Sequence, residues 1–316
     1  MARSSPSPAF RPHAGDTPAR PRSSFALLLI SLRPEQWTKN LIVFAAALFG
    51  GRLLDAGALG LALSTFVIFC ALSGTVYLVN DLMDRVPDQR HPLKRARPIA
   101  SGELDARTAL VGAVVLGLAG LAAAVWIAPA LGLVAGGYLA LLIAYSMVLK
   151  HLVIVDALTI AGGFVLRAAA GAIAVAVPIS SWLLVCTTLL ALFLAFSKRR
   201  HELTLLADGA GDHRRILHEY SPYLLDQMIA VVTASTLIAY TVYSTSAETA
   251  HRLGTTRLGL TIPFVLYGIF RYLYLVHQKR GGGSPAAMLV TDGPLLACVA
   301  LWAMAVAVIL YSPLGR

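Results

Sequence analysis

The sequence predicts an all-α fold, namely a polytopic membrane bundle of nine transmembrane helices with a polar cap on the cytoplasmic side. Of the 316 residues, 57% are hydrophobic and 13% are charged, whereas an ordinary soluble domain carries about 25% charged residues. The mean hydropathy is +0.72. This composition argues against a soluble enzyme and against a disordered regulator, and it favours a chain whose solvent is the bilayer.

Nine stretches are long and apolar enough to cross a bilayer, which takes roughly 20 mainly apolar residues. They are 36–53, 56–80, 107–127, 129–148, 152–176, 181–197, 223–245, 257–277 and 291–312. A shorter apolar run at 23–33 ends before Pro34, which predicts an interfacial helix. Residues 1–24 are rich in Pro, Ser and Arg and predict a disordered basic tail ahead of one membrane domain over 25–316.

The net charge of +10 is spread unevenly over the predicted loops. If the N-terminus is cytoplasmic, the cytoplasmic loops between spans hold 14 Lys and Arg residues and the outer segments hold four. Positive residues collect in the cytoplasmic loops of membrane proteins. We therefore expect a plasma-membrane protein with its N-terminus inside and its C-terminus outside, and no nucleic-acid partner. The two long loops, 81–107 and 198–222, are then both cytoplasmic.

An acidic cluster follows the second span and consists of Asn80, Asp81, Asp84 and Asp88. On a helix, positions 80, 84 and 88 share one face and 81 lies beside them. Closely packed carboxylates repel one another, and a divalent cation relieves that repulsion. Oxygen donors favour Mg²⁺, which completes its shell with water and substrate phosphates. We predict Mg²⁺ with Asn80, Asp84 and Asp88 as ligands; the alternative is a solvated acidic helix end neutralised by neighbouring arginines.

A basic segment comes directly after the acids and contains Lys94 and Arg97. Acids followed at once by bases suit a magnesium–diphosphate ligand, with the metal on one side and cations on the other. The alternative interpretation is that these bases serve only the positive-inside topology.

The segment Asn80-Asp-Leu-Met-Asp-Arg-Val-Pro-Asp88, followed by His91-Pro-Leu-Lys-Arg-Ala-Arg-Pro-Ile99, resembles the UbiA superfamily of intramembrane prenyltransferases. The likeness covers nearly the whole chain after residue 25. It extends to three further segments, Arg33–Asn40, Tyr145–Lys150 and Gly163–Gly171. The resemblance implies a UbiA-like bundle of nine helices with a magnesium-diphosphate site beneath a cytoplasmic cap.

One segment departs from the common family pattern. Typical family members carry a second aspartate-rich motif after the sixth span, where this chain has Ser197-Lys-Arg-Arg-His-Glu-Leu203. Together with Asp156, this basic segment resembles one branch of the superfamily, the decaprenyl-phosphate phosphoribosyltransferases of actinobacterial cell-wall synthesis. Members of that branch transfer 5-phosphoribose from phosphoribosyl diphosphate (PRPP) to a polyprenyl phosphate, release diphosphate and supply arabinan precursors.

The resemblance implies roles for the candidate residues. The catalytic candidates are Asp81, Asp84, Lys94, Arg97 and Asp156. The substrate-binding candidates are Lys39, Tyr145, Lys150, Lys198, Arg199, Arg200 and Glu202. The bases of this second set would bind the 5-phosphate or the acceptor phosphate, and the carboxylate would bind ribose hydroxyls or fix the bases.

Further charges lie at the ends of the spans or inside them. Asp156 is near the cytoplasmic end of the fifth span, and the deeper Arg167 indicates a structural partner or a subunit contact. Arg33 is interpreted as an interface anchor. Small residues in the third and fifth spans would allow close packing within one chain or in a homo-oligomer.

Two other functions remain as alternatives. The first is UbiA-type transfer of a prenyl group from a prenyl diphosphate to an aromatic acceptor. The second is a transporter or channel, which would line a path across the bilayer with charges. The charges here gather on one face, which argues against transport.

Overall fold

The computed structural model describes residues 23–92, 94–207, 219–279, 288–289 and 291–312, with only the main chain of 204–207. The described residues form helices and no strand. Most of the predicted basic tail lies outside these residues. The predicted interfacial helix is present as α1 (Ser24–Ser31), and the chain then turns at Arg33, whose φ is 53°, into the 3₁₀ segment η1 (Pro34–Phe44).

Eight helices of the described chain are long and apolar enough to span a bilayer, so the protein is a multi-pass membrane protein. They are α3 (Ala56–Met83), α6 (Ala106–Ile127), α7 (Pro129–Met147), α8 (Val155–Ala174), α9 (Ser181–Ala207, spanning over Ser181–Leu203), α10 (Pro222–Thr245), α12 (Ile262–Gln278, spanning together with the preceding 3₁₀ turn over Arg257–Gln278) and α14 (Gly293–Tyr311). They correspond to the second to ninth predicted spans, which confirms the all-α membrane bundle.

The first predicted span, 36–53, is not one continuous α-helix. It consists of η1 and the five-residue helix α2 (Ala45–Phe49). Asn40 of η1 is fully buried, donates to Ser73 of α3 at 3.3 Å and accepts from Arg167 of α8 at 2.7 Å. The η1 backbone also lies directly on α8, because a Cβ added at Gly171 would meet the Val43 carbonyl oxygen at 2.1 Å. These contacts fix a segment whose hydrophobic pattern alone predicts a straight helix.

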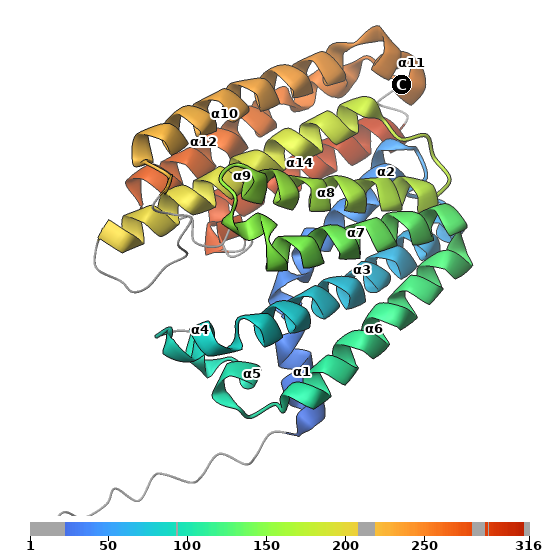
Figure 1. Cartoon of the computed structure of the whole chain (residues 1–316). Coiled ribbons are helices and arrows are strands. Elements are labelled where there is room, and N and C mark those ends of the chain that lie inside the picture. The colour runs from blue at the N-terminus through green and yellow to red at the C-terminus, as the bar shows by residue number, and fades with distance from the viewer. Residues whose placement is uncertain (1–22, 93, 208–218, 280–287, 290, 313–316) are drawn as a thin grey trace, which may run out of the picture.

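Successive spans alternate in direction, so the connections gather at two ends of the bundle (Figure 1). One end carries α4 (Arg85–Arg90), η2 (Lys94–Ala96), α5 (Pro98–Ser101) and η3 (Leu149–His151). We call this the α4 end. The opposite end carries α2, α11 (Ala247–Leu253) and η5 (Arg257–Thr261), and we call it the α11 end.

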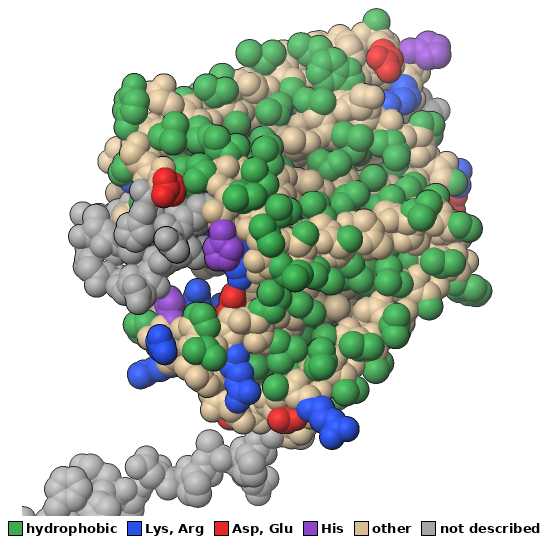
Figure 2. All heavy atoms as spheres, viewed as in Figure 1, with side chains coloured by type: hydrophobic (Ala, Val, Ile, Leu, Met, Phe, Trp, Pro, Cys, Tyr) green, Lys and Arg blue, Asp and Glu red, His purple; other side chains and the backbone are tan. Residues whose placement is uncertain are grey.

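Each half of the bundle has its own apolar core. Phe69, Leu131 and Tyr138 belong to the core of α3, α7 and α8, and Phe193 and Ile229 belong to the core of α9, α10 and α12. Many large apolar side chains instead face outward, as expected of a surface in contact with lipid. Figure 2 shows this apolar surface over the helices, with charged side chains gathered around a hollow at the α4 end.

Candidate active site

The predicted acidic cluster lies where α3 passes into α4. The helix is interrupted at Asp84, whose φ of −90° and ψ of 10° leave the α-helical range. The backbone still continues, because the Asp88 N–H donates to the Asp84 carbonyl at 2.8 Å. The side chains of Asp81 and Asp88 are only 3% and 4% exposed, whereas that of Asp84 is 30% exposed. Asn80 is half-buried beside them.

Every carboxylate of this cluster is paired with a cation from another element. Arg97 donates through Nη1 to Asp88 at 2.5 Å and to Asp81 at 3.1 Å. Arg33 donates to the same oxygen of Asp81, and Lys150 of η3 donates to Asp84 at 2.7 Å. Side-chain cations therefore relieve the repulsion among the acids, and they come from the segment that follows the cluster and from two distant segments.

Arg33 differs from its sequence interpretation. The sequence indicates an interface anchor, whereas in the structure Arg33 is bonded to Asp81 and its guanidinium carbon lies 4.8 Å from the centroid of the Tyr77 ring. The left-handed backbone of Arg33 turns its side chain toward α3, and no local sequence pattern indicates this. The alternative of an acidic helix end neutralised by its neighbours Arg85 and Arg90 also differs from the structure, because the ion pairs of these acids are with Arg33, Arg97 and Lys150.

The side-chain oxygens of the acidic cluster suit a hard cation whose remaining ligands come from a substrate. Among the described residues, no three Asp, Glu, His or Cys side chains converge to hold a metal by themselves. Asn80, Asp84 and Asp88 nevertheless offer only oxygens, and Asp84 is the most exposed of the acids. This fits Mg²⁺, which typically uses one or two carboxylates together with substrate phosphates.

Lys94 lies in the same cap. It is half-buried in η2, and its backbone N–H approaches His91 Nδ1 at 3.4 Å. Its backbone carbonyl accepts from the Arg97 N–H at 2.9 Å. This short turn links Lys94 to Arg97, which is bonded to Asp81 and Asp88 of the acidic cluster.

A second cluster joins four predicted residues from α7, α8 and α9. The Arg199 Nε donates to Asp156 at 2.8 Å, its Nη1 donates to Glu202 at 2.8 Å, and its Nη2 approaches the Tyr145 hydroxyl at 3.4 Å. Asp156 is 0% and Arg199 2% exposed. With two carboxylate partners and almost no exposure, Arg199 is placed to position its neighbours rather than to offer its charge to a ligand.

Tyr220 completes this second cluster and was missed by sequence reasoning. Its hydroxyl accepts the Ile154 N–H at 2.7 Å and donates to the other Asp156 oxygen at 2.9 Å. Ile154 has φ 67°, a left-handed conformation that is strained for a β-branched residue. Burial raises the pKa of Tyr220 to about 12, so the hydroxyl keeps its proton. Nothing in the local sequence distinguishes Tyr220 from other tyrosines.

Two lysines form a positive region between the clusters. Lys198 is 40% exposed and lies 3.9 Å from Glu202. Lys39 of η1 is half-buried, and its burial, followed by the positive charges of Lys198, Arg167 and Arg33, lowers its pKa to about 7, opposed by Glu35. Like charges gathered in this way favour an anionic ligand.

Arg200 and Arg167 are each hydrogen-bonded to partners outside the two clusters. The Arg200 Nε donates to Asp226 of α10 at 2.9 Å, away from the Arg199 network. Arg167 is buried and donates to Asn40 and to the Tyr138 hydroxyl, each at 2.7 Å. These bonds agree with the structural partner expected for Arg167. Residues 208–218 of the predicted cytoplasmic loop 198–222 lie outside the described residues.

The chain is similar to curated proteins over most of its length. Decaprenyl-phosphate phosphoribosyltransferase of Mycobacterium tuberculosis is 33% identical over 287 residues, 89% of this chain and 93% of that protein. The protein of the same name from Mycolicibacterium smegmatis is 33% identical over 246 residues, 77% of each chain. The Corynebacterium glutamicum protein of that name is 31% identical over 90% of this chain and 86% of its own length.

Solved structures show the same fold. A UbiA homolog from Archaeoglobus fulgidus bound to DMAPP and Mg²⁺ has a TM-score of 0.68 at 19% identity, over 90% of this chain and 99% of that one. A structure of a UbiA homolog from that organism bound to GPP and Mg²⁺ has a TM-score of 0.65 over the same shares. The model of the UbiA prenyltransferase family matches residues 40–290. The chain is a transferase that belongs to the UbiA prenyltransferase family.

Proposed function

We propose that the protein transfers 5-phosphoribose from PRPP to a polyprenyl phosphate of the decaprenyl class, with release of diphosphate. The observation that carries the proposal is the end of α9, where typical family members have a second acidic cluster and this chain presents Lys198, with Arg199 paired to Asp156 and Glu202 beside it. The names of the mycobacterial and corynebacterial relatives support it. The product would supply precursors of cell-wall arabinan.

The acidic cluster is the proposed site of the donor diphosphate. Asn80, Asp84 and Asp88 would hold Mg²⁺, which when bound neutralises diphosphate charge and favours its departure. Lys150 and Arg97 already lie within hydrogen-bond distance of these acids. Together with Lys94 they would donate to diphosphate oxygens, the charge-assisted bonding that guanidinium and ammonium groups provide.

Lys39 and Lys198 are the proposed binders of a further phosphate. The reaction brings the 5-phosphate, the diphosphate and the acceptor phosphate into one site, so it needs cations beyond those of the acidic cluster. Lys198 would supply positive charge on the α9 side, and Lys39 of η1, whose pKa burial lowers to about 7, would be fully protonated beside a bound phosphate. The Asp156–Arg199–Glu202 network would fix the end of α9 that carries Lys198, and Glu202 would face the ribose hydroxyls.

The proposed chemistry is a single displacement at the anomeric carbon of ribose. An oxygen of the lipid phosphate forms the new bond to C1 as the bond from C1 to the diphosphate oxygen breaks, through an oxocarbenium-like state with inversion. The lipid phosphate is already ionised, so no general base is needed. Positioning and neutralisation of charge are then the main catalytic contributions of the protein.

The orientation follows from the charges of the loops. We infer that the α4 end faces the cytoplasm and that the N-terminus lies on that side, with the C-terminus outside. The positive-inside distribution supports this orientation. It places the site where a water-soluble phosphosugar enters from the cytoplasm, while the lipid acceptor enters from the plasma membrane.

The alternative is transfer of a prenyl group to an aromatic acceptor. The prenyl diphosphate ligands of the archaeal structures favour this alternative. A thermal-shift measurement on the purified protein separates the two, because a bound ligand stabilises the native state. With Mg²⁺ present, we expect PRPP to raise the Tm more in the wild type than in Lys198→Ala. Stabilisation by geranyl diphosphate and none by PRPP would favour the alternative.

A further inference from the structure

A pocket lies at the α11 end, remote from the candidate active site. Its volume is about 180 Å³, and it is bounded by α2, the α8–α9 connection, α11 and the end of α14. Ala172 in its wall lies 16 residues after Asp156 on the same helix, and 16 helical residues span about 24 Å. The pocket is therefore separate from both clusters described above.

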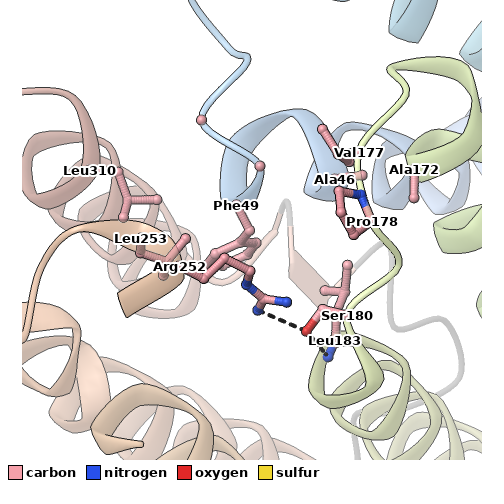
Figure 3. A pocket seen from close by; sticks show the side chains of 12 residues that line it. Ala46, Phe49, Ala172, Val177, Pro178, Ser180, Leu183, Arg252, Leu253 and Leu310 are labelled. Carbon is pink, nitrogen blue, oxygen red and sulfur yellow. Dashed lines mark hydrogen bonds between the residues drawn. The ribbon is translucent and has the colours of Figure 1, made fainter. Parts of the chain in front are cut away.

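The walls of the pocket are apolar except on one side. Phe49, Val177, Leu183 and Leu310 supply hydrophobic surface, and Figure 3 shows Arg252 reaching from α11 toward Ser180. A small water-soluble anion gains nothing from such walls. An amphiphile gains from both parts, because its apolar portion leaves water while its polar group meets the arginine.

The polar side of the pocket consists of donors. Arg252 Nη2 donates to Ser180 Oγ at 3.0 Å, and the same oxygen lies 3.3 Å from the Leu183 backbone nitrogen. Within the described chain, no carboxylate lies within ion-pair distance of Arg252, whereas Arg52 at the same end is paired with Asp55 at 3.3 Å. A guanidinium that keeps its net charge beside a pocket favours a phosphate or carboxylate, which it binds in bidentate fashion.

We propose that this Arg252 pocket binds the anionic headgroup of a membrane phospholipid. The phosphodiester lies on Arg252 and the Ser180 hydroxyl, and the glycerol and upper acyl carbons lie against Phe49, Leu183 and Leu310. The position at the end of the spanning helices places the pocket at the membrane–water interface, where headgroups lie. This inference does not rest on the proposed function.

The test uses the full-length protein purified in a neutral detergent and titrated with dioctanoyl phosphatidylglycerol. Tm as a function of lipid concentration gives an apparent affinity. Arg252→Gln should weaken that affinity roughly 10- to 100-fold, the effect of losing charge-assisted hydrogen bonds. Arg257→Gln, an exposed arginine at the same end outside the pocket lining, should leave it unchanged.

Further variants and ligands establish whether the lipid binds in this pocket. Leu183→Trp keeps Arg252 but fills the pocket, so it should also weaken binding and does not depend on how Arg252→Gln folds. Lys198→Ala should have no effect, because Lys198 belongs to the α4 end. Wild-type affinity in Arg252→Gln would overturn the proposal. Equal stabilisation by dioctanoylglycerol or by inorganic phosphate would overturn it as well.

Discussion

Arg199 and Asp156 form an ion pair in the interior of the bundle, with Arg199 Nε 2.8 Å from Asp156 Oδ2 and neither side chain more than 2% exposed. Glu202 binds the Arg199 member of the pair, and Tyr220 binds the Asp156 member. The pair therefore joins α8 to α9 one residue away from Lys198, which lies on α9 next to Arg199. The end of α9 that carries Lys198 is therefore held in place by an ion pair that is shielded from solvent.

Breaking this pair should be costly. Asp156→Ala leaves a buried guanidinium with one carboxylate fewer, and breaking a buried pair costs about 3–5 kcal/mol. The matched change Asp226→Ala breaks the ion pair between Asp226 and Arg200, whose side chains are 39% and 25% exposed, respectively. An exposed pair contributes about 0–1 kcal/mol. Thermal unfolding in one detergent measures both. Equal losses of Tm in the two variants would contradict the larger contribution that we assign to the buried Asp156–Arg199 pair.

Tyr220 should be a positioning residue. Tyr220→Phe removes the hydroxyl that bonds both Ile154 and Asp156, and an unsatisfied buried group costs about 1–3 kcal/mol. We expect a lower Tm and a reduced kcat, because the turn before α8 also sets the position of Lys150. Tyr223→Phe is the control, since Tyr223 is 73% exposed. Wild-type kcat and Tm in Tyr220→Phe would show that Tyr220 positions nothing.

Asp84 should be required for turnover but not for folding. Asp84→Ala removes a half-exposed carboxylate at a helix end, so the protein should still purify as a folded species. We expect kcat to fall by at least about 100-fold, as when a preorganised electrostatic contact is lost. Glu103→Ala removes an exposed acid of the same cap and should leave kcat unchanged. Retained activity with normal magnesium dependence in Asp84→Ala would exclude Asp84 as a metal ligand.

The two lysines should bind substrate phosphates. Lys39→Ala and Lys198→Ala should each raise the KM for PRPP or for the lipid by roughly tenfold, because each removes one charge-assisted contact. Lys279→Ala, an exposed lysine at the same end of the bundle, is the control. Steady-state kinetics with each substrate varied in turn identifies which phosphate each lysine binds. Unchanged KM values for both substrates would place the third phosphate elsewhere.

Hydropathy predicts eight of the spans because a bilayer requires continuous apolar length, and that requirement is local in sequence. It fails for 36–53, where the structure depends on contacts of Asn40 and Gly171 with other helices. The acidic cluster is equally visible, because its spacing matches the turn of a helix. The sequence therefore predicts the span lengths well, and it predicts the path of the chain between them less well.

The charge partners could not be predicted in this way. Arg33 is 48 positions from Asp81, and Tyr220 is 64 positions from Asp156. Pairings of that kind are set by how the helices pack, and no short pattern encodes them. Arg199 is a further example. Its place in a basic segment predicts a substrate ligand, whereas the packing of α8 against α9 pairs it with the carboxylates of Asp156 and Glu202.

The most direct test of the central claim is the identity of the donor. Purified protein with Mg²⁺, decaprenyl phosphate and PRPP is compared with the same protein given Mg²⁺, a prenyl diphosphate and an aromatic acid, and the lipid products are identified by mass spectrometry. We predict a phosphoribosylated lipid in the first reaction, absent with Asp84→Ala. A prenylated aromatic product in the second reaction and no lipid product in the first would contradict the proposed function.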